Sequence, residues 1–532
     1  MKNFTLCLLF LFSLSFRLSA QTPGTLNPAF SQNGWYTTYG NNNGFGISRV
    51  LIQADEKILV CTEAYFSNEA HQAVVLRYKT DGTPDPDFGG GDGMVRSKDD
   101  AGINLYTRAA GMALQSTGKI IVAGDQLYNS ERIFRLQPDG TLDVTFGLNG
   151  VVDVNRPNLE FICHVAVQSD DKIIVCGKES RFVSGVLEPH VFLWRFTPDG
   201  ATDMSFGNSG VVSYNSQAWL GTFETYLVIN DLIVLPNDDI LVNQSFTKYP
   251  DNFVMLTKLT NDGAFDTSFG VAGHSIHSIK NNDGNYTFSS SAVQENGSVI
   301  SLFTTRDTIN STYTESVFRV NAQGQPDPSL NVNIGIIGSF PVKTELFVSG
   351  NLFYYCRKSD SQTENSYNVL HCYDLNGNLV AGFGNAGIAV INQNDIPVSA
   401  ASPTMVVDSN GDIYLSSITP DPGNSDNKQF LISQVIGAVN NVATNDYTAT
   451  NEFSVYPNPS SGLFYINNHS NTSLSVQLEV KNSLGQVVFS ATDFTMNEAI
   501  NLSNMAPGMY FIQLSDGSRL QSFKVIKNKQ TN

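Results

Sequence analysis

A basic and an acidic residue recur together five times in this 532-residue chain, always eight positions apart. In each copy the base lies five residues before a glycine, and the acid lies three residues after that glycine. The glycine follows an aspartate in four copies and a glutamine in the fifth. A guanidinium group can donate two parallel hydrogen bonds to a carboxylate, so this spacing predicts a recurring ion pair. In a sixth copy, Cys372 and Val380 replace base and acid together. We therefore interpret the pairs as structural; they are Arg77 with Asp85, Arg135 with Asp143, Arg195 with Asp203, Lys258 with Asp266, and Arg319 with Asp327.

Other residue types that could carry chemistry are scattered. His274 and His277 lie three positions apart in a predicted strand, where they point to opposite faces and cannot chelate one metal ion. We find no nucleophile elbow, no phosphate-binding loop and no HExxH motif. The sequence thus indicates no catalytic, metal-binding or cofactor-binding residue. Two carboxylates on one face could still cleave a glycan, but sequence alone does not place two carboxyl groups at the separation which that reaction needs.

Five of the six cysteines lie outside the N-terminal segment. Cys61, Cys176 and Cys356 share one position of the repeat described below, where other copies have mostly small residues, which indicates a packing role. Cys163 and Cys176 face each other across a predicted hairpin turn. One disulfide and two unpaired thiols therefore both stay open as alternatives.

The charged pairs belong to a longer repeated phrase, which reads DGTLDVTFGLNG at residues 139–150. Between copies lie four short stretches rich in Val, Ile and Phe, for example residues 150–154, 164–168, 172–176 and 192–196, separated by Asp/Gly turns. Four short strands in about 60 residues match one blade of a β-propeller. We expect the phenylalanine to wedge between blades and the glycine after it to adopt backbone angles closed to other residues. These anchor residues are Phe30, Phe88, Phe146, Phe206, Phe269, Leu330 and Phe383.

The two ends of the repeat region complement each other. The last unit has no phrase after its fourth strand, and the first unit begins with half a phrase at residues 26–34. In a closed ring these halves would meet near residues 432–436, leaving no sheet edge unpaired. The sequence thus predicts an all-β fold: a seven-bladed propeller of four-stranded blades over residues 21–437. Each charged pair should tie the fourth strand of a unit to the loop between blades.

The units resemble the delta-60 repeats of secreted bacterial proteins, a family with an LDxxFGxxG core. That resemblance implies a propeller and no shared enzymatic activity. The Phe-Gly dipeptide also suggests integrin-type repeats, but those bind calcium through DxDxDG loops, and this chain has no loop with that spacing of carboxylates.

Two further segments concern export. Residues 1–20 combine Lys2, an apolar run at 6–14 and a small-residue end, which predicts a signal peptide cleaved between Ala20 and Gln21. No later stretch is long and apolar enough to span a bilayer. Residues 438–451 are polar and read as a linker, and residues 452–532 alternate like the half-buried strands of a small β-sandwich.

This C-terminal stretch is similar to the type A sorting domain of the type IX secretion system. The resemblance implies export across the outer membrane by the secretion machinery as partner, removal of the tail, and attachment to the cell surface or release. The residues that carry it are Tyr456, Pro457, Asn458, Pro459, Gly462, Gly485, Gly508, Tyr510 and Lys524.

Composition narrows the function only coarsely. The net charge of −18 argues against binding nucleic acid or anionic lipid, whose charges would be repelled. We expect an exported binding or scaffold module for an unknown extracellular glycan, peptide or protein. The alternative is a polysaccharide lyase or glycoside hydrolase that uses carboxylates or tyrosines on the same propeller. Because a fold does not determine a function, only a site can decide between them.

Overall fold

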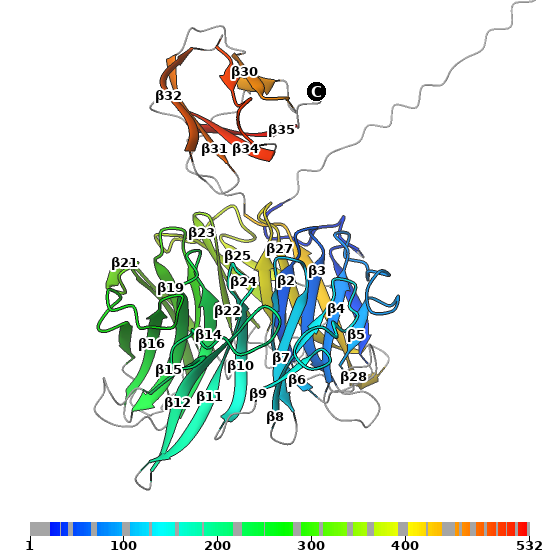
Figure 1. Cartoon of the computed structure of the whole chain (residues 1–532), viewed down its shortest axis with the longest axis vertical. Coiled ribbons are helices and arrows are strands. Elements are labelled where there is room, and N and C mark those ends of the chain that lie inside the picture. Colours follow the sequence, from blue (N-terminus) through cyan, green and yellow to red (C-terminus); the bar gives the residue numbers. More distant parts are fainter. Residues whose placement is uncertain are drawn as a thin grey trace, which may run out of the picture. The chain divides into compact units, whose positions relative to one another are not determined.

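The chain divides into two compact units, residues 1–440 and 441–532 (Figure 1). The computed structural model describes residues 22–528 except for 32, 41–45, 65–71, 98–106, 127–129, 155–158, 184–185, 216–225, 249–250, 280–288, 308–311, 338–343, 359–366, 392–402, 422–423, 439–452, 457–459, 469–474, 483–486, 496–497, 507 and 516–519. The predicted signal peptide, with Ala20 and Gln21, lies outside the described residues, as does most of the predicted linker.

The first unit consists of four-stranded antiparallel sheets, which we call blades and number in chain order. Blades one to three comprise β2 (Gly46–Ile52), β3 (Ile58–Ala64), β4 (Gln72–Tyr78) and β5 (Met94–Arg96); β6 (Thr107–Leu114), β7 (Ile120–Gln126), β8 (Ser130–Leu136) and β9 (Val151–Val154); and β10 (Leu159–Val167), β11 (Ile173–Val183), β12 (Val186–Phe196) and β13 (Val211–Tyr214). Strands β11 and β12 are longer than their neighbours and extend beyond the ring (Figure 1).

Blades four to six repeat this order. They comprise β14 (Tyr226–Val234), β15 (Ile240–Lys248), β16 (Asp251–Leu259) and β17 (His274–Ile279); β18 (Ser289–Val293), β19 (Val299–Asp307), β20 (Thr312–Val320) and β21 (Pro326–Ile337); and β22 (Glu345–Ser349), β23 (Leu352–Lys358), β24 (Asn368–Asp374) and β25 (Ile388–Ile391). The second and third strands bury both faces against neighbouring blades, as in β4, where every side chain is buried. This explains why such strands read as continuous apolar runs without alternation.

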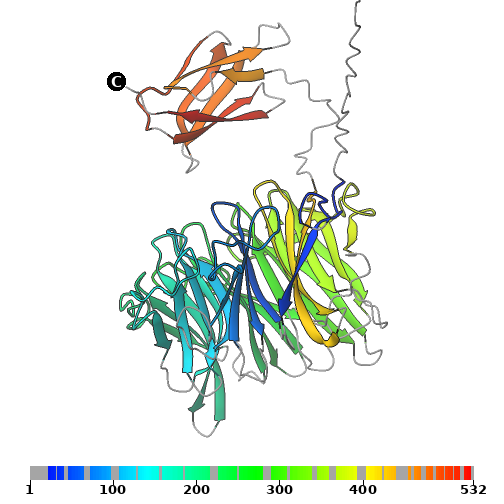
Figure 2. The ribbon, with the colours of Figure 1, turned by 90° about the vertical axis from the view of Figure 1, so that its right-hand side faces the viewer.

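Blade seven is built from both ends of the unit. It contains β26 (Thr404–Val407), β27 (Ile413–Asp421) and β28 (Asn424–Val435), and its fourth strand is β1 (Trp35–Gly40). The blue strand β1 lies beside the yellow and orange strands of this blade (Figure 2). The first strand of each blade contacts that of the next, and β2 contacts β26, so the described strands form a closed ring. This arrangement is consistent with the predicted count of seven blades.

The two half-phrases meet as predicted. Leu26 forms a β-bridge with Val435, as Leu142 does with Leu136 inside blade two. The backbone N–H of Asn27 donates to the carbonyl of Gln434 at 2.9 Å, in the same register as Asp143 on Arg135. In blade seven a neutral amide pair thus replaces the charged pair: the Asn27 side-chain amide donates to the Gln434 amide oxygen at 2.9 Å.

One prediction about the repeat was wrong. We grouped residues 150–154 with the stretches 164–168, 172–176 and 192–196 that follow them, but β9 pairs with the preceding strand β8 and not with β10. The phrase is a tight turn that brings the chain back alongside the strand it has just left, because the Arg135 N–H donates to the Gly150 carbonyl at 3.2 Å. The phrase therefore joins the third and fourth strands within a blade, and it is not a loop between blades.

The anchor residue of the phrase nevertheless reaches the next blade. All seven anchor side chains are buried, with at most 1% of their surface exposed. A Cβ atom on Gly140 or Gly200 would lie 2.9 Å from the ring of Phe88 or Phe146 of the preceding blade, and both glycines have φ of +89°. Only glycine allows both that close approach and that backbone angle.

The second unit forms two sheets around one apolar core that contains Phe464, Leu478, Ile512 and Val525. This agrees with the predicted small β-sandwich. One sheet has the order β29 (Phe453–Tyr456), β30 (Leu463–Asn468) and β33 (Ile500–Asn501), and the other β32 (Val487–Thr495), β31 (Ser475–Asn482), β34 (Gly508–Ser515) and β35 (Leu520–Lys527). Among the described residues, no helix is long and apolar enough to cross a membrane.

Candidate functional site

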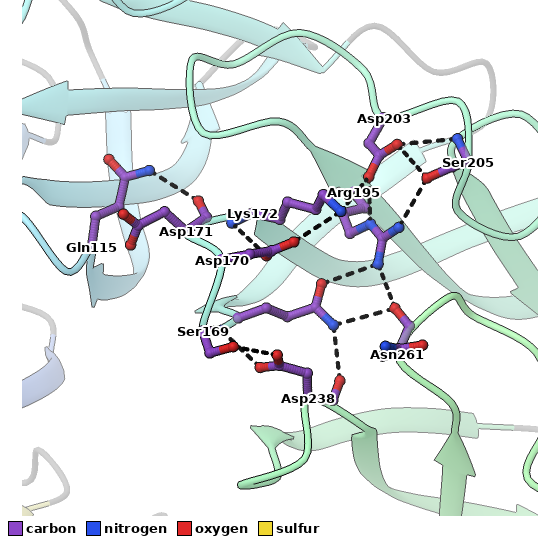
Figure 3. A network of polar contacts seen from close by, with 11 residues as sticks. Gln115, Ser169, Asp170, Asp171, Lys172, Arg195, Asp203, Ser205, Asp238 and Asn261 are labelled. Carbon is purple, nitrogen blue, oxygen red and sulfur yellow. Dashed lines mark hydrogen bonds and ion pairs between the residues drawn. The ribbon is translucent and has the colours of Figure 1, made fainter. Parts of the chain in front are cut away.

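The recurring arginine is the centre of a polar network between blades (Figure 3). In blade three, the Arg195 Nε donates to Asp203 at 2.9 Å and one terminal nitrogen donates to the Ser205 hydroxyl at 3.2 Å. The other terminal nitrogen donates to the Gln168 amide oxygen at 3.1 Å and to the carbonyl of Asn261 in blade four. The guanidinium carbon also lies 4.6 Å from the centre of the Phe206 ring. Arg195 therefore joins its own phrase to the next blade.

Two neighbouring side chains complete this connection. The Gln168 amide donates to the carbonyls of Asp238 at 2.8 Å and Asn261 at 3.2 Å, and the Ser169 N–H donates to the Asp238 carboxylate at 2.7 Å. We call this set the seam latch. The same latch joins blades two and three, where the donors are Gln115, Ser116 and Arg135 and the acceptors are Asp171 and Pro198.

The other recurring pairs have the same short geometry within their blades. The base-to-carboxylate distance is 2.7 Å for Arg77–Asp85, Lys258–Asp266 and Arg319–Asp327, and 2.8 Å for Arg135–Asp143. Burial raises the pKa of Asp143, but hydrogen bonds from Lys119 and Thr145 and the charge of Arg135 outweigh it, so that the pKa falls well below its usual range. The carboxylates are thus held ionised by their partners, which supports the structural role proposed for them.

The latch residues are replaced at the seam between blades four and five. Leu235 stands in the position of Gln168, Pro236 in that of Ser169, and Lys258 in that of Arg195. On the blade-five side, Gly297 takes the position of Asp238 and Ala322 that of Asn261. The blades stay joined through the Gly270 N–H, which donates to the Gln323 carbonyl at 2.7 Å.

A pocket of about 280 Å³ lies at this seam, and we call it the seam pocket. Leu235, Leu241, Phe269, Val293 and Val299 supply its apolar lining. Its polar lining includes Lys258, whose Nζ lies 2.7 Å from Asp266 and 3.1 Å from Asp239 of its own blade. Burial lowers the pKa of Lys258, but the hydrogen bonds that its ammonium group donates to these carboxylates outweigh burial and raise the pKa. The ammonium group thus stays charged and turned toward blade four.

A second polar cluster lies between blades five and six and was not found from the sequence. The Tyr355 hydroxyl donates to the Glu315 carboxylate, and the Tyr373 hydroxyl lies 3.5 Å from His371 Nδ1. Burial lowers the pKa of His371 to about 4 and raises that of Tyr373 to about 12. All four side chains are at least 95% buried, so the cluster reads as a core network. The sequence feature that could have revealed this cluster is the presence of His371 and Tyr373 at alternate positions of one strand.

The remaining candidates lie as follows. His274 is buried against Thr257, at 2.9 Å, while His277 packs its ring 4.3 Å from Phe318, so the two do not form one site. Cys163 and Cys176 are free thiols. No group of three or more His, Cys, Asp or Glu side chains in the described part of the chain is placed to hold a metal ion.

The sorting-motif residues lie at the edges and in the core of the second unit. Tyr456 ends β29 half-exposed with its ring 5.9 Å from Tyr465, whereas Tyr510 is buried and its hydroxyl donates to the Ala506 carbonyl at 2.7 Å. Gly462 has φ of +138° beside Ser503. Gly508 begins β34 and Lys524 lies in β35, while Pro457, Asn458, Pro459 and Gly485 lie outside the described residues.

Two protein families match parts of the chain. Residues 454–528 match the family described as a secretion system C-terminal sorting domain. Residues 53–88, 115–146 and 168–206 match a domain of unknown function, DUF5122, described as a β-propeller. Each matched propeller segment ends at an anchor phenylalanine, so the match follows the repeat. The likeness to delta-60 repeats stays a resemblance.

Solved propeller structures resemble the chain at low sequence identity. Polysaccharide lyase Uly1 has a TM-score of 0.47 and 10% identity over 79% of this chain and 98% of the lyase chain. The β-propeller domain of the trilobed protease from Pyrococcus furiosus has a TM-score of 0.37 and 8% identity over 77% and 100%. An ulvan lyase has a TM-score of 0.36 and 10% identity over 72% and 94%.

No curated protein sequence gives a significant match. The family matches and the strand order agree on both units. The chain is a β-propeller protein with a C-terminal type IX sorting domain, which directs it to the cell surface or the medium.

Proposed function

We propose that this protein is an exported binding or scaffold module whose propeller presents a ligand site outside the cell. The observation that carries the proposal is the seam pocket, which opens where the latch of the two preceding seams is replaced. A concave, mostly apolar site with a few polar groups is the usual form of a ligand site. The ligand that we propose for this pocket is an extracellular glycan, peptide or protein.

The closed ring supports this role physically. Seam latches and the strand β1 hold the blades, so the pocket walls on blades four and five are positioned before a ligand arrives. Binding to a preorganised site loses less conformational entropy than binding to one that must first order itself. A rigid exported ring thus suits recognition of a partner at the cell surface.

The proposal can be tested with the chain that comprises residues 21–532 on arrays of glycans and of peptides. Every hit is then incubated with the protein, and products of hydrolysis or elimination are measured. We expect hits that bind and stay intact. Turnover of a bound glycan would contradict the proposal in favour of a polysaccharide lyase or glycoside hydrolase, and a lack of any bound partner would contradict it outright.

A further inference from the structure

At two seams of the propeller an arginine guanidinium group of the chain itself lies between neighbouring blades. At the seams that follow blades two and three, a guanidinium group donates to the carbonyl of the next blade, Pro198 in one case and Asn261 in the other. Ala322 holds the equivalent position at the seam pocket and lines it. The position that holds the arginine at those seams is occupied here by Lys258, and its ammonium group is bound to Asp266 and Asp239 of its own blade.

An aromatic ring marks the same position. In blades one to three, the guanidinium carbon lies 4.5 to 4.7 Å from the centre of the anchor ring. In blade four the anchor is Phe269, which lines the seam pocket where the base is a lysine. A guanidinium plane stacks on an aromatic face better than an ammonium group does. Phe269 is only 1% exposed, so a planar cation in the pocket would meet the margin of this ring.

The charge around the pocket favours a cation as well. Asp239 and Asp266 share the single positive charge of Lys258, which leaves one negative charge in surplus beside the pocket. The side chains of these three residues are only 15 to 16% exposed, so solvent screens that surplus weakly. Glu295 adds an exposed carboxylate to the lining.

From these observations we propose that the seam pocket binds the guanidinium group of an arginine side chain, presented by a peptide or protein outside the cell. The inference rests on the proposed function, because it names the ligand chemistry of the same site. The bound guanidinium would take the place that Arg195 holds at the preceding seam: its N–H groups donate to the Ala322 carbonyl, and it lies beside Phe269.

The test is calorimetric titration of the chain that comprises residues 21–532 with acetyl-arginine amide, acetyl-lysine amide and acetyl-citrulline amide. The decisive variant is Leu235→Gln with Lys258→Arg, which restores two of the three latch residues of blade three and so fills the pocket from within. Met204→Gln, an exposed position 64% accessible on blade three, is the matched control. Because the decisive variant copies a seam that already folds in this chain, we expect it to stay folded, which a thermal melt checks.

We expect acetyl-arginine amide to bind at least about tenfold more tightly than the lysine and citrulline compounds, corresponding to about 1.4 kcal/mol or more. The Leu235→Gln/Lys258→Arg protein should lose that binding, and Met204→Gln should keep it. Equal binding of lysine, or arginine binding that survives in the latch variant, would overturn the inference. If the array screen finds ligands while arginine does not bind, the inference falls and the proposed function stands. If nothing binds in either experiment, both fall.

Discussion

The pair Arg195–Asp203 allows the structural role of the recurring charges to be tested. We consider Arg195→Met, Asp203→Leu and the double variant. The arginine side chain is 5% exposed and the aspartate side chain 11%, so each charge relies on its partner. Removing one member of a buried ion pair typically costs about 3–5 kcal/mol of unfolding free energy, because the other charge is left buried.

The structure places Arg195→Met at the lower end of that range. After the arginine is removed, Asp203 keeps the Ser205 N–H at 3.1 Å and hydroxyl at 2.6 Å, and Lys172 remains 3.6 Å away. We therefore expect a loss of about 3 kcal/mol for Arg195→Met. The double variant should lose less than this single variant, because no uncompensated carboxylate remains; the remaining cost, about 1–2 kcal/mol, comes from the hydrogen-bond partners in blades three and four that lose their arginine.

Urea unfolding followed by tryptophan fluorescence measures these losses. All three tryptophans lie between residues 35 and 219, so the signal reports the propeller and not the sorting domain. Trp194 is adjacent to Arg195 and packs 5.2 Å from Phe196. A double variant that loses as much as the two single variants together would refute the reasoning, since it would mean that the two charges act independently.

Three further predictions concern closure, pH and the thiols. Deleting residues 22–40 removes β1 and the half-phrase, so by calorimetry the melting temperature should fall by more than about 5 °C, and a smaller fall would mean that the ring does not depend on this strand. Burial lowers the pKa of His274 and of His371 to about 4. In the unfolded chain these rings take up protons near pH 6.5. Their contribution to the stability of the folded state is therefore present above pH 6.5 and is lost as the pH falls to about 4. Replacing both with glutamine should flatten that part of the stability curve, and an unchanged slope would contradict it. Burial raises the pKa of the Cys61 thiol to about 12 and also raises that of Cys176, so iodoacetamide should label neither before unfolding, as mass spectrometry can show; rapid labelling of native protein would contradict this.

Much of the fold follows from the sequence because the same pattern of strands, turns and buried anchor residue recurs in every unit of the repeat. The phrase with its buried phenylalanine gives the period, and the half-phrase at Leu26 gives the closure. The position of the phrase within a blade was missed, because a strand such as residues 151–154 reads the same whether it pairs with the strand before it or after it. Ala438 was assigned to the linker, yet it is buried and its N–H donates to the Tyr354 hydroxyl at 3.1 Å.

The seam pocket was not predicted from the sequence, and the reason is a different one. Leu235, Pro236 and Lys258 are unremarkable as residue types in their own repeat. Their role becomes visible only when it is known that they face Gly297 and Ala322 of the next blade, which are 39 to 87 residues away in sequence. Spacing within a repeat predicts contacts inside a blade, such as Arg195 with Asp203, but it does not say which turns oppose each other across a seam.

The central claim is that the propeller is complete in itself and that the second unit is an export address. The most direct test follows a chain that ends at residue 440 beside the full-length chain, in cells that carry the secretion system. The intact mass of protein from the periplasm, the cell surface and the medium is then measured. We expect the truncated chain to accumulate in the periplasm as a folded propeller, and the exported full-length product to have lost residues 454–528. Normal export of the truncated chain, or an exported product that keeps its full C-terminus, would contradict the account.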